Sequence, residues 1–164
     1  MYGNLGSLYQ EGTVNVINFK RYNATLNTDA DVTPTTTLSV NINTAIARKS
    51  DPAATSGSGI YTSVTEIPAI FPLRYSNGKA AHQLLPAIYE GGYDNNTNNL
   101  FNGQLQIAQQ IPFVPGLSLK GVYSYQKSYA FGKTWSLPMT FYSLNAQDEY
   151  AVQKVGPPAP TLSE

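Results

Sequence analysis

The chain carries few residues that could do chemistry, and His82 is the first to consider. It is the single histidine, and the chain has no cysteine, so the imidazole and thiolate ligands that zinc prefers are scarce. The GxSxG turn that exposes the nucleophile of an α/β-hydrolase is also missing. We therefore predict that His82 is an exposed loop histidine, that the chain has no catalytic residue and no metal site, and that it is not an enzyme.

Two groups of oxygen-bearing side chains deserve the same scrutiny. Asp29 and Asp31 are two residues apart, but a glycosidase needs its two carboxyl groups in a cleft at a set separation. We predict solvation or contact with another part of the protein for this pair. The run Asp94-Asn95-Asn96 offers close oxygen ligands without the calcium-loop pattern of an EF-hand. A polar turn is the favoured interpretation, and a calcium site is the alternative.

Aromatic residues outside the regular patterns form a third candidate group. The chain has 12 Tyr, against 6 Phe and 1 Trp, and tyrosine combines an apolar ring with a hydroxyl that stays wet. Those in the long connecting segments could stack on a sugar or contact a partner protein. The alternative, which we favour, is that they pack the loops together. These candidate residues are Tyr61, Tyr75, Tyr89, Tyr93 and Trp135.

Composition narrows the possible partners. Lys+Arg and Asp+Glu are 10 each, and only 12% of residues are charged. A balanced and weak charge argues against nucleic acid as a partner and against a polybasic membrane-surface protein. No phosphate-binding GxxxxGK[ST] loop is present, so we predict no nucleotide and no other cofactor. No apolar run approaches the roughly 18 residues that a transmembrane helix needs.

The stretch from Thr36 to Arg48 shows most clearly which kind of secondary structure must position these residues. Apolar Leu38, Val40 and Ile42 alternate there with polar residues, which is the period of a β-strand with two different faces. The stretch is longer than the roughly 5–6 residues of a mean soluble strand and suits the roughly 9–11 of a membrane-spanning one. Similar patterns predict strands at about 2–9, 20–32, 36–48, 101–111 and 117–131.

The connections between these strands differ in length. Those near Pro34 and Pro115 are tight, whereas residues 49–99 and 132–164 are long. We expect a short helix over 60–67 in the first long segment and no strand after Leu144 in the second. Short turns at one end and long loops at the other are typical of outer-membrane barrels. We therefore predict one all-β domain, an antiparallel up-and-down transmembrane β-barrel segment of about five strands with long extracellular loops.

The alternation assigns each parity of these strands to one side of the barrel wall. We expect the polar parity to face the lumen, and its members are Asn23, Asn27, Asp29, Asn41, Asn43, Gln104 and Gln106. We expect the apolar parity to face lipid, and its members are Leu26, Leu38, Val40, Ile42, Leu105, Ile107, Leu119, Tyr123 and Tyr125. A soluble carbohydrate-binding β-sandwich, with its apolar parity in a core, is the alternative.

Several stretches together resemble SusC/RagA-type TonB-dependent outer-membrane transporters. They are LYQEG, FKRYNATLNTD, TTTLSVNI, IYTSVTEIPAIFPLRYSNG, NNLFNGQLQIAQQIPFVPGLSLKGVYSY and TWSLPMTFYSLNA, in that order along the chain. The resemblance implies a barrel of about 22 strands around a plug domain in the bacterial outer membrane. It also implies that TonB supplies the energy for transport through the plug. A SusD-like surface lipoprotein would act as a lid, and the substrate would be a glycan or peptide. The chain carries no plug and no TonB box, so we expect a fragment of such a barrel.

Overall fold

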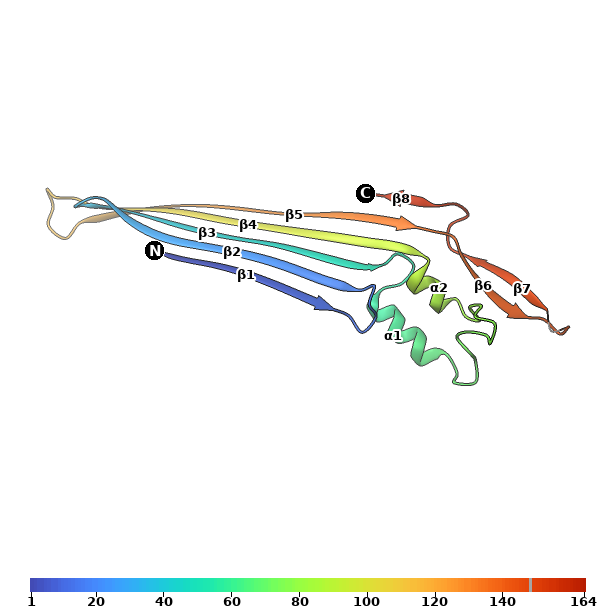
Figure 1. Cartoon of the computed structure of the whole chain (residues 1–164). Helices are drawn as coiled ribbons and strands as arrows, with labels where there is room; N and C mark the ends of the chain where they lie inside the picture. The colour runs from blue at the N-terminus through green and yellow to red at the C-terminus, as the bar shows by residue number, and fades with distance from the viewer. Residues whose placement is uncertain (148) are drawn as a thin grey trace. The chain divides into compact units, whose positions relative to one another are not determined.

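The computed structural model describes residues 1–147 and 149–164, which form an all-β protein with two short helices (Figure 1). An open antiparallel sheet has the strand order β1-β2-β3-β4-β5-β8, and β6 and β7 form a separate two-stranded sheet. The elements are β1 (Tyr2–Glu11), β2 (Asn18–Thr33), β3 (Thr36–Pro52), α1 (Gly57–Glu66), α2 (Leu84–Tyr89), β4 (Gly92–Gln110), β5 (Ser118–Ser136), β6 (Met139–Leu144), β7 (Tyr150–Val155) and β8 (Thr161–Ser163).

The all-β class, the antiparallel arrangement and the five predicted strands are confirmed, but the strands are longer than predicted. β4 begins at Gly92 rather than near 101, because Tyr93 to Asn99 pairs with its neighbours although it is polar on both parities. The helix predicted over 60–67 is α1. The loop predicted over 132–164 contains the strand β6, and the prediction of no strand after Leu144 was wrong, since β7 and β8 follow it. Both are too short for periodicity to reveal them, and β7 is defined by its pairing with β6.

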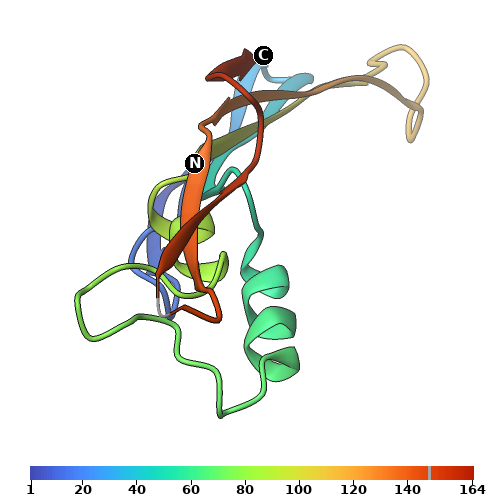
Figure 2. The same ribbon diagram turned by 90° about the vertical axis from the view of Figure 1, so that its right-hand side faces the viewer.

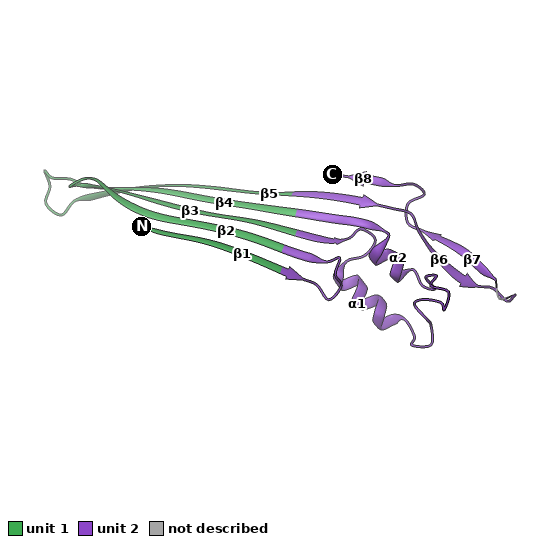
Figure 3. Cartoon of the chain, in the orientation of Figure 1, with its two compact units in different colours: residues 1–9, 20–48, 97–130 green, residues 10–19, 49–96, 131–164 purple. Residues whose placement is uncertain are grey.

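The chain divides into two compact units where the sequence predicted one domain (Figure 3). Unit 1 comprises residues 1–9, 20–48 and 97–130, and unit 2 comprises residues 10–19, 49–96 and 131–164. Unit 1 is a single layer of sheet built from parts of β1 to β5. Ala45 is its one buried hydrophobic residue, so unit 1 has almost no core of its own.

Unit 2 has a small hydrophobic core around its helices. Ile60 of α1 packs with Leu84 and Ile88 of α2, and half-buried apolar residues of 14–17 close over them. The chain enters α1 at Ser56, whose hydroxyl accepts a hydrogen bond from the Gly59 amide at 3.2 Å. Figure 2 shows α2 beside α1 and β6, and α2 contacts both elements. No helix in the described ranges is long and apolar enough to cross a membrane.

A glycine fixes the start of β4 in unit 2. Gly92 has a φ of +96°, in the left-handed region that L side chains rarely adopt. A Cβ built at this position would lie 1.8 Å from the carbonyl oxygen of Trp135 in β5. The close approach of the two backbones therefore requires glycine at position 92.

Candidate functional site

The polar residues of four neighbouring strands gather on one face of unit 1, which we call the polar face. They surround an open hollow of about 930 Å³. The Asn41 amide donates a long hydrogen bond of 3.5 Å to Gln104 Oε1, which ties β3 to β4 across this face. Its polar lining residues are Thr25, Asn27, Asn41, Asn43, Asn102, Gln104, Ser124 and Gln126. Four of the seven predicted lumen-facing residues, Asn27, Asn41, Asn43 and Gln104, therefore line one surface.

Asn23 has a different environment from the other predicted lumen-facing residues. A Cβ at Gly6 of β1 would lie 2.6 Å from the Asn23 side-chain nitrogen, so this asparagine packs against the neighbouring strand. Its Oδ1 is buried and accepts no hydrogen bond within the described chain. Asn23 therefore depends on glycine at position 6. Asp29 and Gln106 do not line the hollow.

The apolar residues of the same strands gather on the opposite parity, which we call the apolar face. Phe101 of β4 and Tyr125 of β5 are in ring contact there, with centroids 6.3 Å apart. Leu119 and Tyr123 of β5 have 60% and 66% of their surface exposed. Leu105, Ile107 and Tyr125 are also exposed, and Leu26, Leu38, Val40 and Ile42 are half-buried. No layer of unit 1 covers this face.

The structure places the five candidate aromatic residues in unit 2, but only three lie outside the sheets. The prediction of loop positions was wrong for Tyr93, which lies in β4, and for Trp135, which lies in β5 opposite Leu162 of β8. Tyr61 projects from α1, and its hydroxyl shares a 2.8 Å hydrogen bond with Thr13. Tyr61 therefore holds the connection between β1 and β2 against α1.

Tyr75 belongs to an aromatic cluster that the sequence did not reveal. Its ring meets the ring of Tyr150 edge to face, with centroids 5.1 Å apart. The ammonium of Lys79 lies 4.6 Å from the ring centre of Tyr142 and 4.7 Å from that of Tyr150. β6 carries Tyr142 and β7 carries Tyr150, so the missed strand β7 explains why sequence reasoning could not bring these residues together.

A pocket of about 340 Å³ opens beside this cluster. We call it the Lys79 pocket. Tyr89 of α2 and Tyr142 of β6 line it. Tyr89 is one of the aromatic candidates predicted from the sequence, whereas Tyr142 is not. Its polar lining residues are Arg74, Lys79, Tyr89, Glu90, Thr140 and Tyr142. Cations, a carboxylate, a hydroxyl and aromatic rings together give this pocket the chemistry of a binding site.

His82 and Asp31 make hydrogen bonds within the fold. His82 is half-buried rather than exposed, because its Nδ1 accepts a 3.1 Å hydrogen bond from the Leu84 amide at the start of α2. The Thr37 hydroxyl donates to Asp31 at 2.8 Å, which links β3 to β2. Among the described residues, Asp29 makes no such bond to a neighbouring strand.

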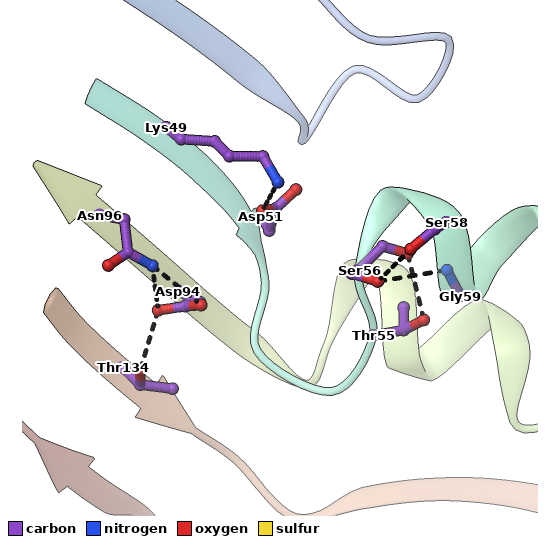
Figure 4. A network of polar contacts seen from close by, with 9 residues as sticks. All are labelled: Lys49, Asp51, Thr55, Ser56, Ser58, Gly59, Asp94, Asn96 and Thr134. Atoms are coloured by element: carbon purple, nitrogen blue, oxygen red, sulfur yellow. Dashed lines mark hydrogen bonds and ion pairs between the residues drawn. The ribbon is translucent and has the colours of Figure 1, made fainter. Parts of the chain in front are cut away.

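The run Asp94-Asn95-Asn96 lies in β4, so the prediction of a polar turn was wrong. Asp94 Oδ1 accepts a 2.9 Å hydrogen bond from the Thr134 hydroxyl and a longer one from the Asn96 amide (Figure 4). Lys49 pairs with buried Asp51 at 2.6 Å in the same region. Within the described chain, no three His, Cys, Asp or Glu side chains lie close enough to hold a metal ion.

Comparison of the chain with known protein families, with curated proteins and with solved structures found no match. Function is therefore inferred from the molecule itself. The two faces of the sheet in unit 1 and the Lys79 pocket in unit 2 are the features that carry it.

Proposed function

We propose that the chain forms part of the wall and outer loops of a TonB-dependent outer-membrane transporter for nutrient uptake. The exposed apolar face of unit 1 is the observation that carries this proposal. A sheet in water buries its apolar face against a second layer, yet the large apolar side chains of β4 and β5 remain uncovered in unit 1. Lipid is the environment that would cover such a face without a second layer of protein.

Strand length supports the same proposal. β2, β3, β4 and β5 contain 16, 17, 19 and 19 residues. A strand rises about 3.3 Å per residue, and roughly 9–11 residues cross the hydrocarbon of a bilayer. Each of these strands would therefore span the lipid and continue beyond it. The stretch of β4 from Asp94 to Asn99 is polar on both parities, which suits a part of the strand outside lipid.

The polar face would form the transport lumen. Its amides and hydroxyls offer hydrogen bonds without strong charge, which suits passage of a glycan oligosaccharide or a peptide. The outer edges of β1 and of β5, which β8 pairs only at residues 134–136, would pair with further strands of the same barrel, because an unpaired edge is costly in lipid. TonB would act through a plug domain, and a SusD-like surface lipoprotein would cover the outer loops.

The soluble carbohydrate-binding β-sandwich is less well supported. A sandwich buries its apolar face under a second sheet, whereas the only buried hydrophobic residue of unit 1 is Ala45. The second sheet of the chain, β6 with β7, belongs to unit 2.

Detergent dependence tests the proposal on the full chain. Light scattering coupled to size-exclusion chromatography would measure its molar mass with and without a mild detergent. We expect aggregation in detergent-free buffer and a defined particle with bound detergent. A monodisperse monomer that unfolds cooperatively without detergent would favour the sandwich and overturn the proposal.

A further inference from the structure

We infer that the Lys79 pocket of unit 2 binds a carboxylate-bearing sugar, a uronate unit of an oligosaccharide. This inference rests on the proposed function for the source of its ligand, and it narrows the nutrient to an acidic glycan. Within the pocket, residues of three segments converge: Arg74 and Lys79 from the segment between the helices, Tyr89 and Glu90 from the end of α2, and Thr140 and Tyr142 from β6.

The positive charge of Lys79 is held in place by two aromatic rings. Its ammonium lies 4.6 Å from the ring centre of Tyr142 and 4.7 Å from that of Tyr150. Cation–π contacts of this kind restrain a lysine whose side chain would otherwise move freely. Because the ammonium is already ordered, binding of a ligand costs less side-chain conformational entropy than it would at a mobile lysine.

A second cation is fixed beside the first. The Arg74 guanidinium donates a 2.6 Å hydrogen bond to the Gly78 carbonyl, and its other N–H groups remain for a ligand. In the described part of the chain, no carboxylate lies within ion-pair distance of Arg74 or Lys79. Among the described residues, the Glu90 carboxylate is the one acidic group that lines the pocket. Two cations against one anion favour a ligand with a negative charge.

The remaining groups favour a sugar acid among anionic ligands. The Tyr89 side chain, 57% exposed, presents a ring on which the C–H face of a sugar could stack. Glu90 accepts hydrogen bonds from hydroxyl groups, and the Thr140 hydroxyl can donate or accept them. The C-terminus of a peptide would also satisfy the cations, but it offers a few backbone N–H groups to Glu90 and Thr140 rather than an array of hydroxyl groups. A neutral sugar would bring no negative charge to the two cations.

Calorimetric titration of the full chain in detergent tests this inference. The probes are trigalacturonic acid, its fully methyl-esterified form, and an N-acetylated tripeptide with a free C-terminal carboxylate. We expect binding of the acid, weakened by added salt because the charges are screened, and binding at least about tenfold weaker for the other two. Equal binding of acid and ester, or preferred binding of the peptide, would overturn the inference.

Two variants and a matched control test whether trigalacturonate binds in the Lys79 pocket. Lys79→Gln removes the ammonium and Tyr89→Ala removes an exposed ring, and each should weaken trigalacturonate binding about tenfold. Lys127→Gln is the control, because Lys127 also lies over a tyrosine ring, 5.7 Å from that of Tyr129, but outside the pocket. Unchanged binding in both pocket variants, with circular dichroism matching the parent, would overturn the inference.

The two proposals fail separately. If the chain is monodisperse without detergent and still binds trigalacturonate, the transporter proposal is overturned. The assignment of the ligand to the Lys79 pocket then stands. If the chain depends on detergent but binds none of the probes, the pocket assignment is overturned. The transporter proposal then stands.

Discussion

The rings of Phe101 in β4 and Tyr125 in β5 lie side by side on the apolar face, with centroids 6.3 Å apart and planes inclined at 55°. Such a pair usually belongs to a protein core, where both rings are buried. Here Phe101 is 40% exposed and Tyr125 is 48% exposed. The contact joins two neighbouring strands with no layer of unit 1 above it, and this exposure supports the proposed role as a barrel wall.

Arginine substitutions on adjacent residues of β4 distinguish the two faces. Ile107 lies on the apolar face and is exposed, whereas Gln106 lies on the opposite parity. In lipid vesicles, Ile107→Arg should lower the free energy of unfolding by about 2–4 kcal/mol, because the charge would enter hydrocarbon in the proposed barrel wall. Gln106→Arg should change it by less than about 1 kcal/mol, since its side chain stays in water.

Urea titrations of both variants, followed by the fluorescence of the single tryptophan, measure this difference. A neutral Ile107→Gln variant controls for the change of shape. Equal losses for Ile107→Arg and Gln106→Arg would contradict the assignment of the faces.

The backbone at Gly92 should tolerate no side chain. Gly92→Ala places a Cβ against the Trp135 carbonyl and forces a left-handed φ on alanine. We expect the free energy of unfolding to fall by about 2 kcal/mol or more. Gly121→Ala in β5 is the matched control, because a Cβ there meets no atom within 4 Å. Its effect should stay within about 0.5 kcal/mol, and a similar loss for both variants would argue against the close approach of β4 and β5.

The start of α1 offers a test of unit 2. Ser56→Ala removes the hydroxyl that accepts from the Gly59 amide, and the loss of such a cap costs about 1 kcal/mol. Hydrogen exchange of the α1 amides should accelerate accordingly. Ser76→Ala, at an exposed turn position, serves as the control. If the α1 amides exchange at the parent rate in Ser56→Ala, the cap does not stabilise the helix.

Strands with a clean period of two could be predicted from the sequence, because alternation records which side each residue faces. Leu38, Val40 and Ile42 share a parity in β3, and the structure keeps Asn41 and Asn43 together on the polar face. The beginning of β4 could not be predicted in this way. Tyr93 to Asn99 is polar on both parities, and its pairing depends on neighbours far away in the sequence.

The Lys79 pocket was the part least accessible to sequence reasoning. Tyr75 and Tyr89 were among the candidates, but Lys79, Tyr142 and Tyr150 were not. Lys79 meets its two rings only because β6 and β7 form a hairpin, and β7 is a six-residue strand. A cation–π contact between residues about 60–70 positions apart leaves no periodic signal in the chain.

The most direct test of the barrel-wall account is a nitroxide scan along β5. The chain has no cysteine, so single cysteines can be introduced and spin-labelled without removing any native one. Labels at Leu119, Tyr123, Tyr125 and Tyr129 would be compared in lipid vesicles with labels at Ser118, Ser124 and Gln126. We predict that collisions with oxygen dominate at the first set and collisions with a water-soluble nickel complex at the second. Equal access of the nickel complex to both sets would contradict the claim that the apolar face meets lipid.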